Sequence, residues 1–212
     1  MALLEADQLT FGYGTETLFQ GRSFSFDAGE LVAITGPSGR GKSTLLYLLG
    51  LMLQATGGTM RVDGVDCSQK SDAERSRLRA TQFGFVFQDA VLDPSRTVLD
   101  NVLEVSLYNG ASRRDAGMRA VRLLHRFGVA HRTSHRPGQV SGGQAQRIAL
   151  CRALLHEPRI VLADEPTGNL DEDSTKVVFG ALRDYAHDSS ALVIIVTHDP
   201  ALAARCDRVV QL

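Results

Sequence analysis

Residues 36–44 are Gly36-Pro37-Ser38-Gly39-Arg40-Gly41-Lys42-Ser43-Thr44 and match the pattern G-x-x-x-x-G-K-[ST]. The apolar run Leu31–Ile34 before them predicts a buried strand, and Thr44–Leu49 after them predicts the start of a helix. A glycine-rich loop in this context curls so that successive backbone N–H groups point at one anion. The helix aims the positive end of its dipole at the same place. All nine residues are therefore predicted to contact the phosphates of a nucleotide.

Two residues of this loop have specific expected roles. Lys42 would reach the β- and γ-phosphates, and the Ser43 hydroxyl would ligate Mg²⁺. The alternative is a glycine turn with a solvated lysine. Average residue frequencies give such a chance match in about one chain in a hundred of this length, and the flanking strand and helix make it rarer.

Composition limits the class of protein. The chain has 212 residues, of which 43% are hydrophobic and 22% are charged, as in one large soluble domain. Its formal net charge of −1 provides no general attraction to nucleic acid, so we expect no nucleic-acid partner. No apolar run approaches the ~20 residues that span a bilayer. The three cysteines, Cys67, Cys151 and Cys206, are far apart and suit free thiols in a reducing cytoplasm.

The hydrophobic pattern predicts an α/β fold. Short apolar segments without alternation are typical of parallel strands covered on both faces, and helical patterns lie between them. The predicted strands of this core sheet are Leu31–Thr35, Phe83–Phe87, Ile160–Ala163, Leu192–Thr197 and Arg208–Leu212. The more alternating segments Leu9–Tyr13 and Ser23–Phe26 predict a small antiparallel side sheet.

The region from about residue 89 to 158 has a different pattern. Thr97–Leu107 and Ser112–Phe127 have helical periodicity, with Gly128 placed to end the second helix. No strand pattern interrupts them. We therefore expect one domain, residues 1–212, with a helical subdomain at about 89–158 inserted into the sheet.

Two further segments carry chemistry. The strand Ile160–Ala163 ends in Asp164 and Glu165, at the sheet edge where ligands bind. Asp164 would hold Mg²⁺ through water, and Glu165 would face the water that attacks the γ-phosphate.

The second segment is Val140-Ser141-Gly142-Gly143-Gln144. Its glycines would let the backbone approach a phosphate, and Ser141 can cap the helix that follows through Ala145–Leu155. Taken by itself, this segment also fits an ordinary capped helix.

Together these motifs resemble the nucleotide-binding subunit of an ATP-binding cassette (ABC) transporter over essentially the whole chain. The resemblance implies a P-loop NTPase (ABC ATPase) fold, ATP and Mg²⁺ as ligands, and ATP hydrolysis. It also implies that residues 141–144 serve the ATP of the opposite subunit, so that two copies enclose two ATP molecules head to tail. Val140 stands where the family usually has Leu, and Arg40 where relatives often have a small residue.

The resemblance assigns the other positions individually. Tyr13 resembles the aromatic residue that stacks on adenine, with Phe11 a weaker candidate. Gln88 matches the glutamine that senses Mg²⁺ and begins the loop facing the membrane partner. His198 matches the switch histidine that contacts the γ-phosphate, and Asp171 lies in the loop that links the two sites. With Lys42 and Glu165, Gln88 and His198 complete the expected catalytic set.

Residues 164–171 are similar to those of the MacB, LolD and FtsE group, whose membrane partners extrude or lift molecules by mechanical motion. This implies an exporter or mechanotransmission subunit, attached to the cytoplasmic face of the membrane through integral permease subunits. A soluble ABC-type ATPase, such as an iron–sulfur assembly factor, is the alternative. Residues 89–94 and Thr97–Leu107 are expected to form the docking groove for the permease. Alternatively, Val91 and Leu92 anchor the subdomain core.

Overall fold

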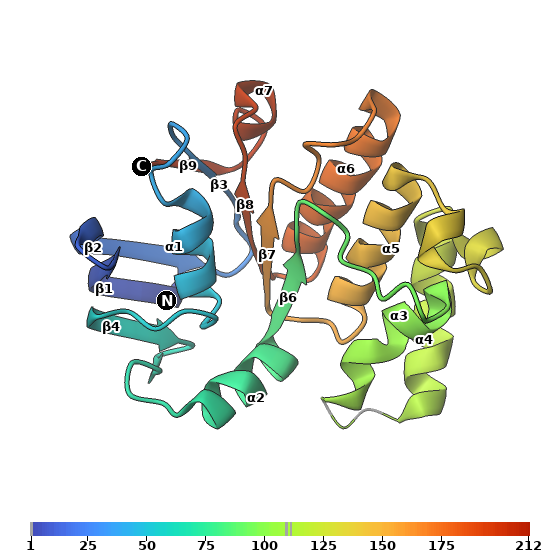
Figure 1. Cartoon of the computed structure of the whole chain (residues 1–212), viewed down its shortest axis with the longest axis horizontal. Coiled ribbons are helices and arrows are strands. Elements are labelled where there is room, and N and C mark those ends of the chain that lie inside the picture. The colour runs from blue at the N-terminus through green and yellow to red at the C-terminus, as the bar shows by residue number, and fades with distance from the viewer. Residues whose placement is uncertain (1, 109, 111) are drawn as a thin grey trace.

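A five-stranded parallel sheet lies at the centre of the computed structural model, which describes residues 2–108, 110 and 112–212 (Figure 1). All neighbouring strands in it are parallel, in the order β6-β7-β8-β3-β9. The strands are β3 (Leu31–Thr35), β6 (Phe83–Val86), β7 (Ile160–Asp164), β8 (Leu192–Val196) and β9 (Arg208–Gln211). They confirm the five predicted core strands, and no observed end differs from its predicted position by more than one residue.

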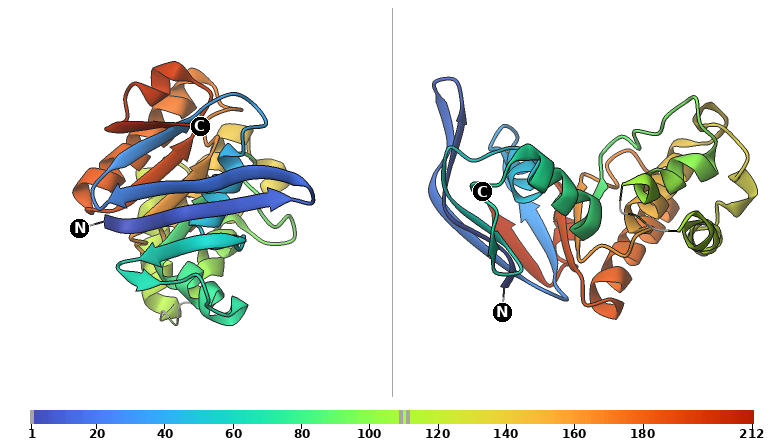
Figure 2. Two further views of the ribbon diagram at one scale, coloured as in Figure 1. Left: turned by 90° about the vertical axis from the view of Figure 1, so that its left-hand side faces the viewer. Right: turned by 90° about the horizontal axis from the view of Figure 1, so that it is seen from below.

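A four-stranded antiparallel sheet lies beside the core sheet at one end of the molecule (Figure 2). Its order is β2-β1-β4-β5, and its strands are β1 (Ala2–Tyr13), β2 (Glu16–Asp27), β4 (Gly57–Val62) and β5 (Val65–Asp66). The predicted side sheet is confirmed, but the prediction found only parts of β1 and β2. Strand β4 was not predicted because it begins with two glycines, which weaken a strand pattern.

Each face of the core sheet carries its own hydrophobic core. Side chains of Val32 and Ile34 pack toward the antiparallel sheet and α1 (Lys42–Leu49). Their neighbours on the opposite face, such as Val161 and Val193, pack with the helices on the other side. Strands covered on both faces contain apolar residues in succession, and for that reason the sequence identified them.

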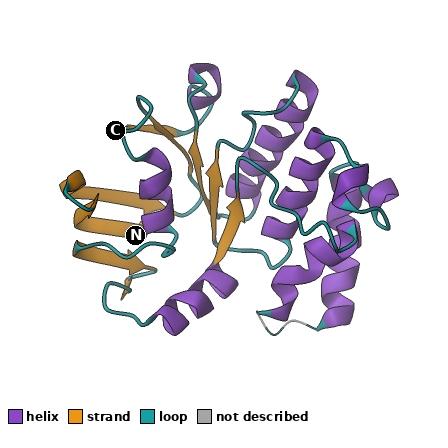
Figure 3. Ribbon diagram, in the orientation of Figure 1, coloured by secondary structure: helices purple, strands orange, loops and turns teal. Residues whose placement is uncertain are grey.

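The helices on the second face form one group, coloured purple beside the core sheet in Figure 3. They are α3 (Val98–Leu103), α4 (Arg113–Arg126), α5 (Gly142–Leu154) and α6 (Glu172–Asp188). Helix α5 packs on β6 of the sheet as well as on α3 and α4. The helical subdomain at about 89–158 therefore remains a prediction, since α5 belongs to both layers.

The remaining helical elements lead into strands or into other helices. Helices α2 (Asp72–Gln82) and α7 (Pro200–Ala203) precede β6 and β9. Of the predicted helix Thr97–Leu107, only the first part is α-helical, and η1 (Glu104–Leu107) continues it as a 3-10 turn. Two further 3-10 turns, η2 (Ala130–Arg132) and η3 (Pro137–Gln139), lead into α5.

Candidate functional site

The glycine-rich loop joins β3 to α1 at the carboxyl edge of the core sheet, and α1 begins at Lys42 rather than at Thr44. Gly41 has a left-handed backbone with φ of 80°, which a glycine adopts without steric cost. A side chain at Gly36 would put a Cβ 2.8 Å from the carbonyl oxygen of Leu212. The Lys42 ammonium lies over this loop, where it donates to the carbonyl oxygens of Gly36 and Pro37 at 2.9 and 3.0 Å.

Ser43 and Asp164 meet at the start of α1. The Ser43 hydroxyl donates to Oδ1 of Asp164 at 3.0 Å, and Tyr47 donates to Oδ2 at 3.0 Å. The carboxylate is only 6% exposed. Burial, with the charge of Asp164, raises the pKa of Tyr47 to about 12, so the phenol keeps its proton and remains a donor.

This pair can take part in a magnesium site. Mg²⁺ prefers oxygen ligands and is usually held by one or two carboxylates together with phosphate oxygens and water. Within the part of the chain that the structure describes, no group of three His, Cys, Asp or Glu side chains could hold a metal ion. Ser43 and Asp164 therefore fit Mg²⁺ as a partial ligand set that a nucleotide's phosphates would complete.

Glu165 and His198 lie in contact beside this pair. Nδ1 of His198 is 2.9 Å from Oε1 of Glu165. Because β7 and β8 are adjacent parallel strands, the residues that follow their carboxyl ends are brought side by side. Glu165 has a φ of 45°, which is uncommon for a residue with a side chain, and its amide donates to the Val196 carbonyl oxygen at 3.0 Å. The structure thus brings the two predicted catalytic residues together.

Gln88 follows β6, the strand next to β7. Its side-chain nitrogen lies 3.9 Å from the point where a Cβ on Gly168 would be. Gly168 in turn donates its amide to the carbonyl oxygen of Glu165 at 3.1 Å. Gln88 therefore lies beside the turn that begins with Glu165.

Tyr13 and Phe11 differ in burial, which separates the two candidates for an adenine-stacking ring. Phe11 is 7% exposed and belongs to the core below the antiparallel sheet, whereas Tyr13 is 54% exposed. The rings meet edge to face, with centroids 5.0 Å apart. Of the two, only Tyr13 has the exposed ring that stacking on adenine would require.

Residues 141–144 open helix α5 with a capping box. The Ser141 hydroxyl accepts from the Gln144 amide at 3.3 Å, and the Gln144 side chain accepts from the Ser141 amide at 3.1 Å. A Cβ on Gly143 would lie 2.5 Å from Oγ of Ser174 on α6, so this glycine is required for helix packing. Nothing lies within 4 Å of a Cβ built on Gly142, whose surroundings are open.

Asp171 caps helix α6, where its Oδ1 accepts from the Ser174 amide at 2.7 Å. That hydrogen bond lowers the pKa of Asp171 and keeps the carboxylate charged. Oδ2 of Asp171 lies 4.0 Å from a Cβ built on Gly143. Asp171 is thus a neighbour of the capped segment at residues 141–144.

The two predicted phosphate cradles lie apart within one chain. Helix α1 is on one side of the core sheet, and helix α5 is on the other (Figure 1). Among the described residues, no hydrogen bond or ion pair joins the loop 36–44 to residues 141–144. The carboxyl edge of the core sheet carries five of the predicted site residues: Lys42, Gln88, Asp164, Glu165 and His198. Ser141 lies elsewhere, at the start of α5.

A family model described as ABC transporter matches residues 19–168, which include the glycine-rich loop, residues 141–144 and the acidic pair. The chain belongs to the ABC transporter family. As a member of it, the chain is an ATPase.

Individual ABC proteins match over nearly the full length. A lipoprotein-releasing system ATP-binding protein LolD 1 of Rhodospirillum rubrum is 43% identical over 100% of this chain and 95% of its own length. A LolD protein of Cereibacter sphaeroides is 44% identical over 99% of this chain and 96% of its own. The ATP-binding cassette MJ0796, solved as a dimer bound to ADP and Pi, superimposes with a TM-score of 0.90 at 32% identity, covering 99% of this chain and 94% of that one.

The ABC cassette has a groove between β6 and the helices. It has a volume of about 740 Å³ and is lined mainly by apolar side chains, among them Phe85, Phe87, Val91, Leu92, Val105 and Tyr108. The sequence left open whether Val91 and Leu92 belong to the groove or anchor the subdomain core, and the two residues differ in burial. Val91 is 63% exposed, whereas Leu92 is half-buried and packs against the helical core.

Sequence analysis missed three residues that support this ABC site. Tyr47 was detectable in principle, because it lies four residues after Ser43 on the same face of α1. Gln146 and Arg152 on α5 contact the backbone near Gln88. No sequence signal predicts these contacts, because the partners are 59 to 62 residues away and accept through the main chain.

Proposed function

We propose that this chain is the ATP-hydrolysing subunit of a membrane ABC complex that releases lipoproteins from a membrane. The observation that carries the proposal is the cluster of Lys42, Ser43, Asp164, Glu165 and His198 at one edge of the sheet. The lipoprotein cargo rests on the names of relatives that are 43–44% identical over nearly the full chain. The same names weigh against a soluble ATPase such as an iron–sulfur assembly factor.

In this proposal one face of the chain binds ATP. The backbone amides of residues 36–44, with Lys42, hold the phosphates, and Tyr13 stacks on the adenine. Arg40 is an exposed residue of this loop and adds a positive charge near the phosphates. Ser43 and Asp164 hold Mg²⁺ with help from Gln88, and Mg²⁺ when bound neutralises charge on the phosphate oxygens.

Hydrolysis then depends on Glu165. Its carboxylate orients a water molecule and accepts a proton from it as the water attacks the γ-phosphate. His198 holds the carboxylate through the 2.9 Å contact at Nδ1, which leaves Nε2 to face the phosphate. Positioning and electrostatics provide most of the rate enhancement in phosphoryl transfer.

We further propose that two copies of the chain form each site. Ser141, Gly142, Gly143 and Gln144 bind the ATP held by the loop of the partner copy, because they cannot reach the loop of their own chain. Asp171 lies beside Gly143 and would link the two sites. The dimers solved for the cassette MJ0796 support this arrangement.

The 740 Å³ groove is the proposed docking site for an integral permease subunit. The apolar lining fits one face of an amphipathic helix. No helix among the described residues has the length and apolar character to cross a membrane. Attached through the permease, the chain would be peripheral at the cytoplasmic face, with export or mechanical extraction of the cargo as the result of hydrolysis.

The test is to purify the tagged chain from detergent-solubilised membranes of its source and to identify the integral proteins that accompany it. The complex, in proteoliposomes loaded with a lipoprotein, should hydrolyse ATP faster than the isolated chain and release the lipoprotein only when ATP is supplied. A Glu165→Gln complex should assemble and release nothing. Release without ATP, or a chain that co-purifies with no membrane protein and hydrolyses ATP at full rate alone, would contradict the proposal.

A further inference from the structure

Helix α5 holds the backbone immediately before Gln88. The side-chain amide of Gln146 donates to the carbonyl oxygen of Phe87 at 2.8 Å. Gln146 is only 3% exposed, and a buried amide of this kind is costly to leave without a partner. The contact therefore ties the last peptide group before Gln88 firmly to α5.

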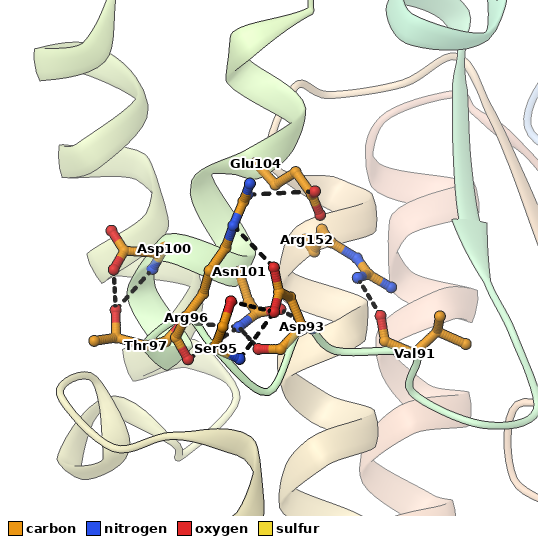
Figure 4. Close-up of polar contacts among 9 residues, drawn as sticks. All are labelled: Val91, Asp93, Ser95, Arg96, Thr97, Asp100, Asn101, Glu104 and Arg152. Carbon is orange, nitrogen blue, oxygen red and sulfur yellow. Dashed lines mark hydrogen bonds and ion pairs between the residues drawn. The ribbon is translucent and has the colours of Figure 1, made fainter.

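The same helix holds the backbone just after Gln88. Two guanidinium nitrogens of Arg152 donate to backbone carbonyl oxygens, one to Ala90 at 3.0 Å and the other to Val91 at 2.8 Å. Figure 4 shows the bond to Val91. Burial lowers the pKa of Arg152, and the charge of Glu104 opposes that effect. A largely buried cation with two carbonyl partners indicates a specific contact rather than a surface one.

Val91 itself has a strained backbone. Its φ is 45°, in the left-handed region that β-branched residues rarely adopt. Such conformations persist only where the surroundings hold them, and they concentrate at functional sites. Arg152 provides one such restraint, and the exposed Val91 side chain extends from this strained residue into the groove.

The segment that follows is fixed as well. The fully buried Asn101 accepts from the amide of Asp93 at 2.7 Å and donates to the carbonyl oxygens of Asp93 and Thr97 at 3.1 and 2.9 Å (Figure 4). Arg96 pairs with Asp93 and Glu104. Residues 93–97 are thus attached to α3, while α5 holds the backbone on both sides of Gln88, at Phe87 and at Ala90 and Val91.

We propose that Gln146 and Arg152 are positioning residues for ATP hydrolysis, which hold Gln88 at a set place relative to helix α5. The inference rests on the role proposed above for Gln88. Because α5 also begins with Ser141, a movement of the partner's ATP against that end of the helix would be transmitted to Gln88 through these two side chains. The groove wall at Val91 would move with them.

The purified full-length chain provides the test. Arg152→Ala should lower kcat for ATP about 10- to 100-fold, the loss expected when a reacting group is misplaced by about 1 Å. The KM for ATP should change by less than about threefold, since the phosphate loop is untouched. Arg152→Lys should recover part of the rate, because an ammonium can still donate to one carbonyl. Hydrogen exchange of residues 88–91 should increase in Arg152→Ala.

Arg119→Ala is the matched control. Arg119 on α4 also donates to a backbone carbonyl, that of Leu155 at 3.2 Å, but does not contact residues 87–91. If both variants lose thermal stability to the same degree while only Arg152→Ala loses kcat, general destabilisation is not the cause. Equal kcat values for the two variants would overturn the proposal.

A double-mutant cycle tests whether Arg152 acts through Gln88. In a Gln88→Ala background, Arg152→Ala should lower kcat by less than about twofold, since the group it positions is gone. Full multiplication of the two effects would overturn the positioning role. An unchanged rate for Gln88→Ala alone would instead contradict the role in hydrolysis proposed for Gln88 itself. If Arg152→Ala does not fold, Gln146→Leu, of similar shape, carries the same cycle with the same outcomes.

Discussion

At the scale of single residues, Glu165 has the most constrained geometry of the catalytic set. A non-glycine residue at φ of 45° carries a cost of about 1–3 kcal/mol. The backbone bond to Val196 and the contact with His198 restrain it. These restraints hold the Glu165 carboxylate against the His198 imidazole, directly after Asp164, which accepts a hydrogen bond from Ser43 of the glycine-rich loop.

We expect Glu165→Gln to bind ATP with nearly unchanged affinity and to lose almost all hydrolysis. The amide keeps the size of the side chain but cannot accept the proton of the attacking water. Dimers should accumulate with ATP, detectable by size-exclusion chromatography. Equilibrium ATP binding and phosphate release check this expectation. A hydrolysis rate within about threefold of the wild-type rate would contradict the role of Glu165 as the proton acceptor.

We expect His156 to make the stability of the protein depend on pH. Burial lowers the pKa of His156, with a hydrogen bond to the Phe83 carbonyl opposing it and Arg119 adding to it. The unfolded chain then binds a proton at a higher pH than the folded chain does. Stability should therefore fall as pH drops below the ordinary value of about 6.5, by at most about 1.4 kcal/mol per pH unit, until the folded form is protonated too.

Urea unfolding between pH 8 and 5 measures this effect. His156→Gln, which can still donate to Phe83, should flatten the decline below about pH 6.5. His131→Gln, at an exposed position, is the control and should leave the slope unchanged. A His156→Gln curve parallel to that of the wild type would rule out His156 as the source.

Residue identities at the site were predictable from sequence wherever a motif carries them. The acidic pair, the glycine-rich loop and His198 all follow apolar strands, and the carboxyl ends of parallel strands share one edge. Tyr47 and Arg152 were not predictable in the same way. Tyr47 could be placed only by its helical spacing from Ser43, and Arg152 contacts main-chain atoms, which no motif marks.

At the scale of elements, burial on both faces determined what could be predicted. The five core strands stand out because their residues are apolar in succession, whereas β4 begins with two glycines and β5 has only two residues, one of them charged. The helix expected over Thr97–Leu107 changes to a 3-10 turn at Glu104, where backbone hydrogen bonds join residues three apart instead of four. Periodicity over eleven residues does not detect such a change.

The groove wall provides a prediction with an internal control. Val91→Asp should leave folding intact to within about 0.5 kcal/mol, because the side chain is exposed and Asp tolerates a left-handed backbone better than Val. Leu92→Asp should cost about 1–3 kcal/mol, because Leu92 packs against the core. Thermal unfolding of both variants and their ATP affinity test the contrast.

The membrane partner separates the two variants further. Val91→Asp should weaken binding of the permease and reduce its stimulation of ATP hydrolysis, with basal hydrolysis by the isolated chain retained. Pull-down with the detergent-solubilised permease and turnover of the reconstituted complex measure both. Normal assembly of Val91→Asp would argue that the groove serves another purpose.

At the scale of the whole molecule, the division of the two phosphate cradles between opposite sides of the core sheet is the feature that favours a dimer. A helix N-terminus and a glycine-rich loop are each suited to phosphate, yet residues 36–44 make no described contact with residues 141–144. In a head-to-tail pair related by twofold symmetry, each loop would face the other copy's segment. The symmetry provides two equivalent sites from two incomplete ones.

Mixing two inactive variants tests this arrangement. Lys42→Ala removes the charge in the loop, and Ser141→Arg places a bulky cation at the N-terminus of α5, so each variant alone should be inactive. In a mixed dimer one site has both defects and the other has none. With independent sites and random pairing, activity should return to about a quarter of the wild-type rate, since about half the dimers are mixed and each has one intact site.

Differently tagged chains verify that mixed dimers form, and nucleotide occupancy distinguishes a silent intact site from an absent one. If mixed dimers form and bind ATP at one site without hydrolysing it, the two sites act only together. If they bind none, each site is not shared between chains as proposed.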